Sequence, residues 1–289
     1  MKVTGISFIR NAEKYDYPIV EAITSILPLC DEFVVALGNS EDGTEQLIRG
    51  INSDKIKIVP TVWDDSLRQG GAVLAVETNK AFDAVSADSD WVFYIQGDEA
   101  VHEQDFPKIK EAMLKWKDHK EVEGLLFNYR HFYGSYDYIG DTRRWYRKEI
   151  RVIRNDKRIR SYKDAQGFRI EGKKLNVKPV DAYIHHYGWV KDPRNQQQKA
   201  LNVSKFWHSD EWINSNIPKT DEFDYSEIDS LQLYKGTHPK VMQPRIQRLN
   251  WKFEHDVSKK KYNFKIAVLT FIEKLTGYRV GEYKNYKVI

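Results

Sequence analysis

Short apolar runs and amphipathic stretches alternate along the first hundred residues. Runs of aromatic and β-branched residues predict buried strands, and they lie at 3–9, 33–37, 55–59 and 91–95. Between them, apolar residues recur at helical spacing and predict helices at 17–27, from Thr44 onward, and at 72–85. Strands that alternate with helices favour a parallel sheet with crossover helices. This part of the chain therefore predicts a Rossmann-like, mostly parallel central sheet flanked by helices.

The pattern is less regular in the rest of the chain. Helices are predicted at 106–117, 196–212 and 263–275, and strands at 124–131, 149–155 and 180–190. The segment 132–146 is rich in Tyr, Gly and Asp, which predicts a loop. From 196 to 289 the pattern favours a mainly helical extension packed on the α/β domain.

The central strand is followed at once by acids. Trp91–Ile95 leads into Gln96, Gly97, Asp98 and Glu99, and two carboxylates beside a buried strand are costly unless something uses them. Ligands of open α/β sheets bind at the carboxyl ends of strands. A carboxylate there can hold Mg²⁺ or Mn²⁺, which in turn binds phosphates. The simpler alternative is that Asp98 caps a helix over 99–105.

Polar side chains follow the first two strands as well. Arg10 and Asn11 come directly after the first, and the turn at 38–44, with Asn39 and Asp42, comes after the second. Because the carboxyl ends of parallel strands share one edge of the sheet, these loops and 96–99 are expected to open on the same side. The sequence thus predicts a nucleotide site there.

Composition narrows the class. The 289 residues carry a net charge of +4, with 41% hydrophobic and 13% aromatic residues, which excludes a disordered chain. Ten Lys and Arg against two acids at 143–163 raise the question of nucleic-acid binding, but the alternating spacing indicates the polar face of a strand, and no nucleic-acid partner is expected. Cys30 is the only cysteine, so no disulfide forms within the chain. With no signal-peptide pattern and no long apolar run, a cytoplasmic protein is predicted.

The motifs SFIRNAE, VVALGNSEDGT, QGGAVLAVETNKAF, DWVFYIQGDE, DAQGF and YIHHYGWV occur in that order over residues 3–195. In this order they resemble the family 2 inverting glycosyltransferases of the GT-A fold. The resemblance implies transfer of a sugar from a nucleotide-sugar, with a UDP-sugar as the expected donor, to a hydroxyl of a glycan or lipid-linked acceptor. It also implies a role in surface polysaccharide assembly and assistance by Mn²⁺ or Mg²⁺. It implies a glycosyltransferase domain over 1–195, with a nucleotide half at 1–101 and an acceptor half at 102–195.

The resemblance also assigns residues. It implies Asp98 and His186 as metal ligands and Asp164 as the general base that takes the acceptor proton. Leu37 and Gln96 stand where the family has acids, so a catalytically degenerate nucleotide-sugar-binding protein is the alternative function. It implies nucleotide contacts from Arg10, Asn11, Asn39, Asp42, Asn79, Gln96 and Gly97. It implies acceptor or phosphate contacts from Glu99, Tyr133, Lys191 and Arg194.

Several of these residues have ordinary structural alternatives. Asp164 could cap a turn, Tyr133 could be packing, and Lys191 and Arg194 could be solvated loop charges. His185 and His186 point to opposite faces if they lie in a strand, so one suits the core and one the site. A nucleotidyltransferase would favour a glycine-rich loop after the first strand, and RNAEKY is not one.

The C-terminal helix and the basic, aromatic tail have three interpretations. They could contact the inner face of an anionic membrane, where a lipid-linked acceptor would lie. They could equally be a packing helix or a contact in a homo-oligomer.

Overall fold

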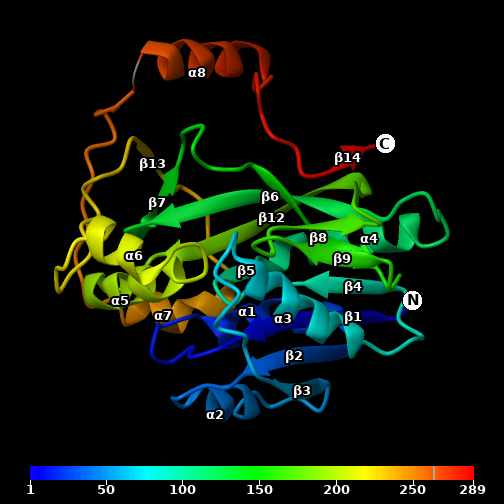
Figure 1. Cartoon of the computed structure of the whole chain (residues 1–289). Coiled ribbons are helices and arrows are strands. Elements are labelled where there is room, and N and C mark those ends of the chain that lie inside the picture. The colour runs from blue at the N-terminus through cyan, green and yellow to red at the C-terminus, as the bar shows by residue number, and fades with distance from the viewer. Residues whose placement is uncertain (263) are drawn as a thin grey trace.

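The computed structural model describes residues 1–262 and 264–289 (Figure 1). Its described residues form an eleven-stranded sheet, a three-stranded sheet and helices that cover both faces of the larger sheet. The strands of the large sheet are β1 Val3–Ile9, β2 Glu32–Gly38, β3 Ile56–Thr61, β4 Trp91–Tyr94, β5 Glu99–Val101, β6 Gly124–Tyr133, β7 Ser135–Gly140, β8 Lys148–Arg154, β12 Asn176–Trp189, β13 Leu231–Leu233 and β14 Lys287–Val288. The small sheet comprises β9 Ile159–Tyr162, β10 Gly167–Ile170 and β11 Lys173–Lys174.

The helices follow the predicted apolar spacing in most places. The α-helices are α1 Ile19–Ile26, α2 Thr44–Arg49, α3 Ala72–Asp83, α4 Phe106–Trp116, α5 Pro193–Ser204, α6 Asp210–Asn216, α7 Gln243–Gln247 and α8 Phe264–Thr276. Short 3₁₀ turns are η1 Leu27–Leu29, η2 Glu103–Asp105 and η3 Lys240–Met242. The last predicted helix was expected to begin at Asn263, which lies outside the described residues.

The sheet runs in the order β13-β7-β6-β8-β4-β1-β2-β3, and β12 lies beside β6. The strands β3, β2, β1 and β4 are parallel neighbours, whereas β8 and β7 are antiparallel to their neighbours. The predicted fold class, an α/β protein with a parallel nucleotide-binding half flanked by helices, is confirmed. The second half of the sheet is mixed, because the hairpin β6–β7 and the pairs β4–β8, β6–β8 and β5–β12 are antiparallel whereas β6 and β12 are parallel.

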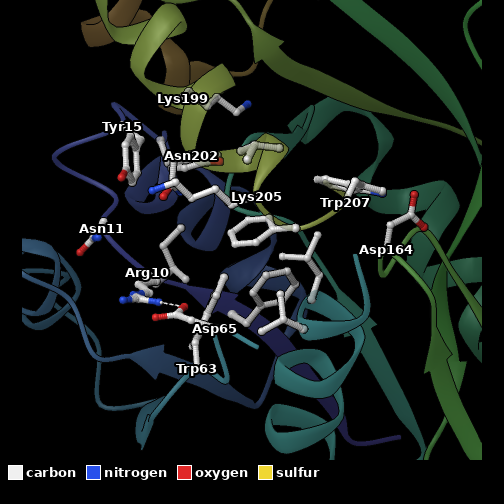
Figure 2. Close-up of a pocket in the computed structure, with 18 of the residues that line it drawn as sticks. Arg10, Asn11, Tyr15, Trp63, Asp65, Asp164, Lys199, Asn202, Lys205 and Trp207 are labelled. Atoms are coloured by element: carbon white, nitrogen blue, oxygen red, sulfur yellow. Dashed lines mark hydrogen bonds and ion pairs between the residues drawn. The ribbon is translucent and has the colours of Figure 1, made fainter. Parts of the chain in front are cut away.

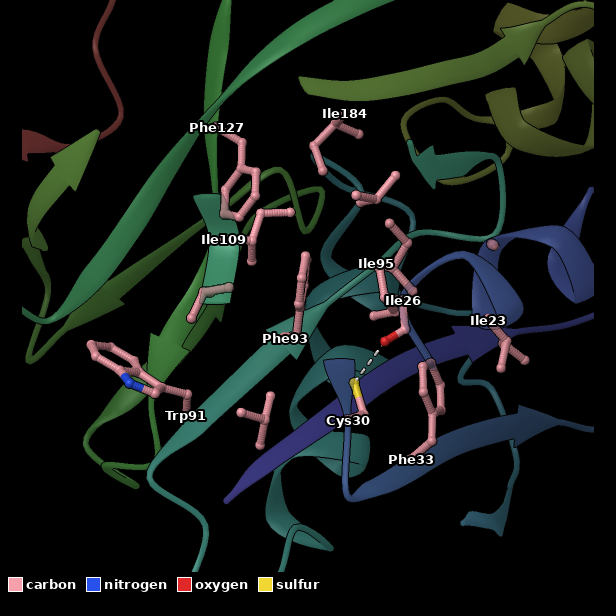
Figure 3. Close-up of a cluster of buried hydrophobic side chains, with 14 of the residues drawn as sticks. Ile23, Ile26, Cys30, Phe33, Trp91, Phe93, Ile95, Ile109, Phe127 and Ile184 are labelled. Atoms are coloured by element: carbon pink, nitrogen blue, oxygen red, sulfur yellow. Dashed lines mark hydrogen bonds between the residues drawn. The ribbon is translucent and has the colours of Figure 1, made fainter. Parts of the chain in front are cut away.

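The core occupies both faces of the parallel half, as alternation along buried strands requires. On β4, Trp91 and Phe93 pack with α1 and α4 (Figure 3), while Val92 and Tyr94 pack with α3. Cys30 belongs to the first cluster, where its thiol donates to the backbone oxygen of Ile26 at 3.3 Å. Since every side chain of β4 is buried, the strand is held in one register and its carboxyl end is placed firmly.

The structure departs from the predicted elements in four places, and the first of them is the helix expected at 196–212, which is divided into α5 and α6. The segment 132–146 contains β7 instead of being only a loop, and residues 99–105 form β5 and η2 instead of one helix. The C-terminal region adds β13 and β14 to the sheet. Three of these short strands, β5, β13 and β14, pair with strands distant in sequence, which periodicity cannot reveal.

The chain turns sharply between β12 and α5. Asp192 caps α5 by accepting from the backbone N–H of Arg194 at 2.9 Å, and Pro193 occupies the first turn. Proline at that place removes only an N–H that has no helical partner, so the pair starts the helix in a defined direction. The consequence is that α5 returns over the carboxyl end of the parallel strands (Figure 1).

Candidate active site

A cavity of about 790 Å³ lies where β1 and β4 end. Arg10 and Asn11 follow β1, and Gln96, Gly97 and Asp98 follow β4, and all of them line it. Figure 2 shows Arg10 and Asn11 on one wall, and Trp207 and Asp164 on the opposite one. The pairing of β1 with β4, extended by the bond from Ile95 N to Ile6 O at 3.0 Å, brings the two loops together. The loops after β1 and β4 therefore lie at the same edge of the sheet, as expected.

Asp98 stands at the centre of a charged cluster. Its Oδ2 accepts from Lys199 Nζ at 3.1 Å, and its Oδ1 lies 3.8 Å from His186 Nε2. The side chain is 13% exposed. Burial alone would raise the pKa of Asp98, but the charges of Lys199 and Lys191 and the hydrogen bond from Lys199 outweigh it and hold the pKa below the usual value. Asp98 is therefore an ionised carboxylate that faces the cavity.

The antiparallel pairing of β5 with β12 is what joins Asp98 to His186. His186 lies opposite Glu99 in this pairing, and the backbone N–H of Tyr187 donates to the backbone oxygen of Asp98 at 2.7 Å. His185 points the other way, toward Arg130 and the ring of Phe132. The two adjacent histidines thus have different surroundings, as expected for a strand.

The hydrogen bonds assign the tautomer of His186. His131 Nε2 donates to the backbone oxygen of Tyr146 at 2.8 Å, so the Nδ1 of neutral His131 accepts. The partner of that nitrogen is His186 Nδ1 at 3.2 Å, which must therefore carry the proton. Burial lowers the pKa of His131 to about 3, and it also lowers that of His186, so both rings are neutral near pH 7. The Nε2 of His186 then presents a lone pair toward Asp98.

These two acceptors fit a divalent cation. A carboxylate oxygen and an imidazole lone pair that face each other at 3.8 Å repel unless a cation lies between them. Mg²⁺ and Mn²⁺ sites commonly use one or two protein ligands and leave other positions to phosphate oxygens and water. Within residues 1–262 and 264–289, no three His, Cys, Asp or Glu side chains gather as a complete protein-only site. The arrangement thus suits a metal shared with a bound phosphate.

Two lysines and a tyrosine surround the same carboxylate. Lys199 Nζ lies 4.8 Å from the ring centre of Tyr17, and Lys191 Nζ lies 4.7 Å from it. Lys191 is fully buried, and its Nζ donates to the backbone oxygen of Asp16. Burial and the charge of Lys199 lower the pKa of Lys191 to about 7. Positive charge is therefore concentrated beside Asp98, where an anion would bind.

Two glycines make room for this cluster. A Cβ on Gly97 would lie 2.9 Å from Ile9 Cδ1. A Cβ on Gly188 would lie 2.7 Å from both Asp98 Oδ2 and the ring of His186. The glycine of the motif HHYGW therefore allows the carboxylate and the imidazole to approach.

Asp164 lies on the opposite wall of the cavity (Figure 2). Its Oδ1 accepts weakly from the N–H of Gln166 at 3.4 Å, so the carboxylate remains available to a ligand. Lys163 and Ala165 on either side have φ of 54° and 59°, a conformation that costs free energy for side chains other than glycine. Gly71 approaches it so closely that a Cβ would lie 2.8 Å from Asp164 Cβ. The backbone is thus arranged to hold Asp164 at the cavity wall.

The end of α5 and the loop after it form the mouth of the cavity. Arg68 pairs with Asp210 at 2.8 Å and donates to the backbone oxygen of Lys205 at 3.0 Å. The ring centre of Phe206 lies 5.7 Å from that of Trp63, which in turn lies 5.9 Å from that of Phe8. These contacts make an aromatic wall next to the polar cluster.

Some residues assigned to the nucleotide hold the loops together. Asn39 Oδ1 accepts from the N–H of Trp63 at 3.2 Å, and Asp42 accepts from the N–H groups of Thr44 and Lys14. Asn79 accepts from the N–H of Ser161 at 2.8 Å and joins α3 to β9. None of the three is among the described residues that line the cavity. Asn11, with φ of 56°, lines it and accepts from the N–H of Glu41 at 2.8 Å.

Gln96 also has an internal role. Its Nε2 donates to Tyr94 Oη at 3.0 Å and toward the backbone oxygen of Ala165 at 3.4 Å. The amide thus ties the loop after β4 to the segment that carries Asp164. Arg10, which also lines the cavity, pairs with Asp65 at 2.7 Å.

The four residues expected at the acceptor or phosphates do not meet at the cavity. Glu99 is fully buried, and Tyr133 packs against Tyr225 and Phe253. Lys191 is fully buried with its Nζ 4.7 Å from the ring centre of Tyr17, and Arg194 is exposed and lies 3.4 Å from Glu222. Arg194 lines a separate, smaller pocket of about 330 Å³.

The sequence reasoning missed the contribution of α5. Lys199 and Asn202 come from a region expected to be an extension beyond the catalytic domain, yet both line the cavity. A helix that starts directly after the strand of His186, through Asp192 and Pro193, was the available signal. It indicates that the helix stays near the strand end, although not which residue reaches Asp98.

Comparisons with known proteins give remote similarities. No family model matches the chain, and no curated protein matches it. Among solved structures, TarS from S. aureus is 16% identical, with a TM-score of 0.41 over 70% of this chain and 39% of that one. Glucosyl-3-phosphoglycerate synthase from Mycobacterium tuberculosis, in complex with Mn²⁺, UDP and glucosyl-3-phosphoglycerate, is 19% identical, with a TM-score of 0.31 over 46% of this chain and 45% of that one.

A third structure, 4-diphosphocytidyl-2C-methyl-D-erythritol synthase from Anaerococcus prevotii, is 11% identical, with a TM-score of 0.39 over 71% of this chain and 95% of that one. The match to TarS in the preceding paragraph spans about two fifths of the length of that protein. Similarities this remote assign no activity, so function has to be inferred from the site.

Proposed function

We propose that the chain is a GT-A-type glycosyltransferase that moves a sugar from a nucleotide-sugar, with UDP as the first candidate nucleotide, to the hydroxyl of a glycan or lipid-linked acceptor. One observation carries the proposal. Asp98 lines the cavity together with Lys199, and the Nε2 lone pair of His186 on β12 faces its carboxylate across 3.8 Å, although His186 is not among the described residues that line the cavity. This is an arrangement for a cation and a diphosphate.

Asp98 and His186 would hold Mn²⁺ or Mg²⁺, which would supply positive charge where the leaving diphosphate gains negative charge. Lys199 adds a second positive charge at the same place, and its ammonium needs no reorganisation because Asp98 and the oxygen of Gly188, at 2.8 Å, already position it. The aromatic wall of Trp63 and Phe206 suits a nucleobase, and Arg10 lies 5.9 Å from the ring centre of Trp63.

Asp164 is proposed as the general base. It lies across the cavity from the loop of Arg10 and Asn11 (Figure 2), and this supports the role because an inverting displacement needs a base near the acceptor hydroxyl. Its side chain bonds only weakly to Gln166, so an acceptor hydroxyl could bind it.

A thermal-shift experiment tests the donor site. Native protein is melted with UDP, GDP, CDP and their glucose conjugates, with and without Mn²⁺, because a ligand of the folded state raises the melting temperature by mass action. We expect a shift with one nucleotide that grows with Mn²⁺ and is absent in Asp98→Asn. A well-folded protein that shifts with none of them contradicts the proposal.

Asp164→Asn tests the base. We expect donor binding to be retained and transfer to fall by at least about 100-fold, the usual contribution of a general base. Product formation by mass spectrometry after incubation with donor and candidate acceptors measures transfer. Asp181→Asn, an exposed carboxylate on β12, is the matched control and should transfer normally. Equal turnover of Asp164→Asn and the native chain would remove Asp164 from this role.

Two contacts favour a second candidate function. Lys199 Nζ already neutralises Asp98 at 3.1 Å, and the side-chain amide of Gln96, at the cavity wall, already donates to Tyr94 Oη. Both features suit a nucleotide-sugar-binding protein without transfer activity. Nucleotide binding that is unaffected by Mn²⁺, together with no transfer to any acceptor, would favour this alternative.

A further inference from the structure

The C-terminal helix α8 has its apolar stripe on the outside. Phe264, Val268, Phe271 and Leu275 are 85%, 41%, 67% and 75% exposed. Their spacing of four, three and four residues places them along one face of the helix. In a surface helix of a globular protein this face packs on the core, so α8 is oriented the opposite way.

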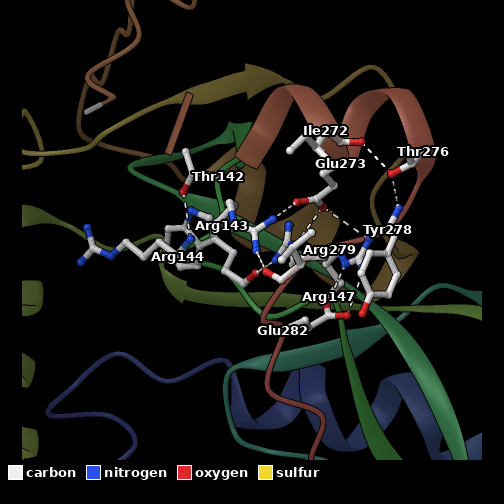
Figure 4. Close-up of polar contacts among 12 residues, drawn as sticks. Thr142, Arg143, Arg144, Arg147, Ile272, Glu273, Thr276, Tyr278, Arg279 and Glu282 are labelled. Atoms are coloured by element: carbon white, nitrogen blue, oxygen red, sulfur yellow. Dashed lines mark hydrogen bonds and ion pairs between the residues drawn. The ribbon is translucent and has the colours of Figure 1, made fainter. Parts of the chain in front are cut away.

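Ion pairs on the opposite face maintain this orientation. Glu273 lies 2.7 Å from Arg143, 2.8 Å from Arg279 and 3.4 Å from Arg147 (Figure 4). Arg279 also donates to the backbone oxygen of Trp145 at 2.7 Å. Glu273 and Arg143 are only 15% and 12% exposed, so turning the apolar face inward would separate largely buried charges. The outward stripe is therefore a stable feature of the fold.

Positive charge borders the stripe on both sides. At 100° per residue, Lys265 and Lys274 lie about 90° on either side of the centre of the stripe. Residues 257–289 contain eight Lys and Arg and two Glu, whereas residues 1–256 contain 38 Lys and Arg and 40 Asp and Glu. The net positive charge of the chain thus comes from the segment 257–289, which contains α8. Tyr278, just after the helix, is 63% exposed.

We propose that α8 docks the protein on an anionic lipid surface. An apolar stripe flanked by lysines is the pattern of a helix that lies in the membrane interface, with its side chains among the acyl chains and its ammonium groups at the headgroups. None of the described helices is long and apolar enough to cross a membrane, and the 13 residues of α8 extend about 20 Å, so α8 lies along the surface. Figure 1 shows α8 at one extremity of the molecule, beyond β7.

Charge favours a lipid surface over a second copy of the chain. If two α8 helices paired face to face, each edge of the contact would carry one lysine from each helix: Lys265 and Lys274 on the same edge in a parallel pair, and two copies of the same lysine in an antiparallel pair. Either pairing sets like charges beside the apolar contact. An anionic surface instead complements the lysine on each side of the stripe.

Vesicle co-sedimentation of the full chain tests the proposal without any measurement of activity. We expect binding to phosphatidylcholine vesicles that contain about 30% phosphatidylglycerol, weaker binding to pure phosphatidylcholine, and release by salt. The double variant Phe271→Ser with Leu275→Ser should bind the anionic vesicles at least about tenfold more weakly. The double variant Lys265→Glu with Lys274→Glu should lose about 30-fold or more.

The matched control changes an apolar and a basic surface residue elsewhere. Leu114 is 54% exposed on α4 and Lys110 is exposed on the same helix, so Leu114→Ser with Lys110→Glu should bind as the native chain does. Melting curves check that all variants fold. Three results would overturn the proposal: no binding of the native chain to anionic vesicles, an equal loss in the control, or a stable dimer by light scattering that Phe271→Ser dissociates. Because donor binding is not measured, failure here is distinct from failure of the proposed enzyme.

Discussion

Asp98 and Glu99 are neighbours in the sequence and have opposite roles in the structure. Asp98 faces the cavity beside Lys199 and the lone pair of His186. Glu99 is fully buried, where its oxygens accept from Arg151 at 2.7 and 2.9 Å and from Tyr129 Oη at 2.7 Å. Its Oε2 also accepts from the backbone N–H of Gln96 at 3.0 Å. Both oxygens of Glu99 are thus hydrogen-bonded within the protein and are not available to a ligand.

The difference shows that two adjacent residues can have separate roles, one in the candidate site and one in the stability of the fold. Because β5 begins at Glu99, consecutive side chains diverge, one toward the cavity and the next toward the interior. Arg151 is itself fully buried, and the rings of Tyr94 and Tyr129 lie 5.0 and 5.2 Å from its guanidinium carbon. Glu99 and Arg151 therefore anchor the loop that presents Asp98.

The largest expected effect comes from breaking the buried pair. Glu99→Ala leaves the Arg151 guanidinium buried without its partner and should lower the free energy of unfolding by about 3–5 kcal/mol. Urea denaturation followed by circular dichroism measures it. The double variant Glu99→Met with Arg151→Met removes both charges and should recover part of the loss. Equal instability of the single and double variants would contradict this role of the pair.

Asp98→Asn, in contrast to Glu99→Ala, should have a small effect on the free energy of unfolding and a large effect on sugar transfer. Transfer is expected to fall by at least about 100-fold, since a carboxylate that places charge at the leaving group is lost. The Mn²⁺-dependent thermal shift should vanish as well. If Asp98→Asn unfolds as readily as Glu99→Ala, the division of roles between the two acids is wrong.

Lys199→Met isolates the ammonium at Asp98. We expect nucleotide affinity to fall and Mn²⁺ affinity to rise, each by roughly tenfold, because Lys199 attracts the diphosphate but competes with the metal for the carboxylate. Calorimetric titration of each ligand measures both. Arg194→Met, which removes an exposed cation outside the cavity, is the control. A parallel loss of both affinities in Lys199→Met would indicate a purely structural lysine.

Glu149 extends the comparison to a buried acid that lacks a full set of partners. Its Oε2 has no hydrogen-bond partner among the described residues, and burial raises its pKa from 4.5 to about 8. Since the folded state holds the proton more tightly than the unfolded state, the free energy of unfolding falls as pH rises from about 4.5 to about 8. Glu149→Gln should match the native chain near pH 4.5 and exceed its stability by at least about 1 kcal/mol at pH 8. Equal pH profiles of the two proteins would contradict the shift.

Local pattern was sufficient for the parallel half of the fold. The run VTGISFI is β1 at its predicted bounds, and the helix expected from Thr44 begins there. Apolar runs, the proline after α1 and the polar loops at strand ends are local signals, so the sheet edge that carries Arg10, Asn11 and Asp98 could be predicted from the chain alone. The opposite orientation of His185 and His186 followed from strand geometry in the same way.

The partners of those residues were decided by contacts between distant segments. Composition and spacing identified Asp98 and Glu99 as a pair of acids, but only the pairing of β5 with β12 and the position of Arg151 on β8 separate a cavity carboxylate from a buried one. Lys199 reaches Asp98 because α5 turns back over the strand ends. The charge on a carboxylate depends on burial and on which cations lie within a few ångströms, and those neighbours are brought together by the tertiary structure and not by proximity in sequence.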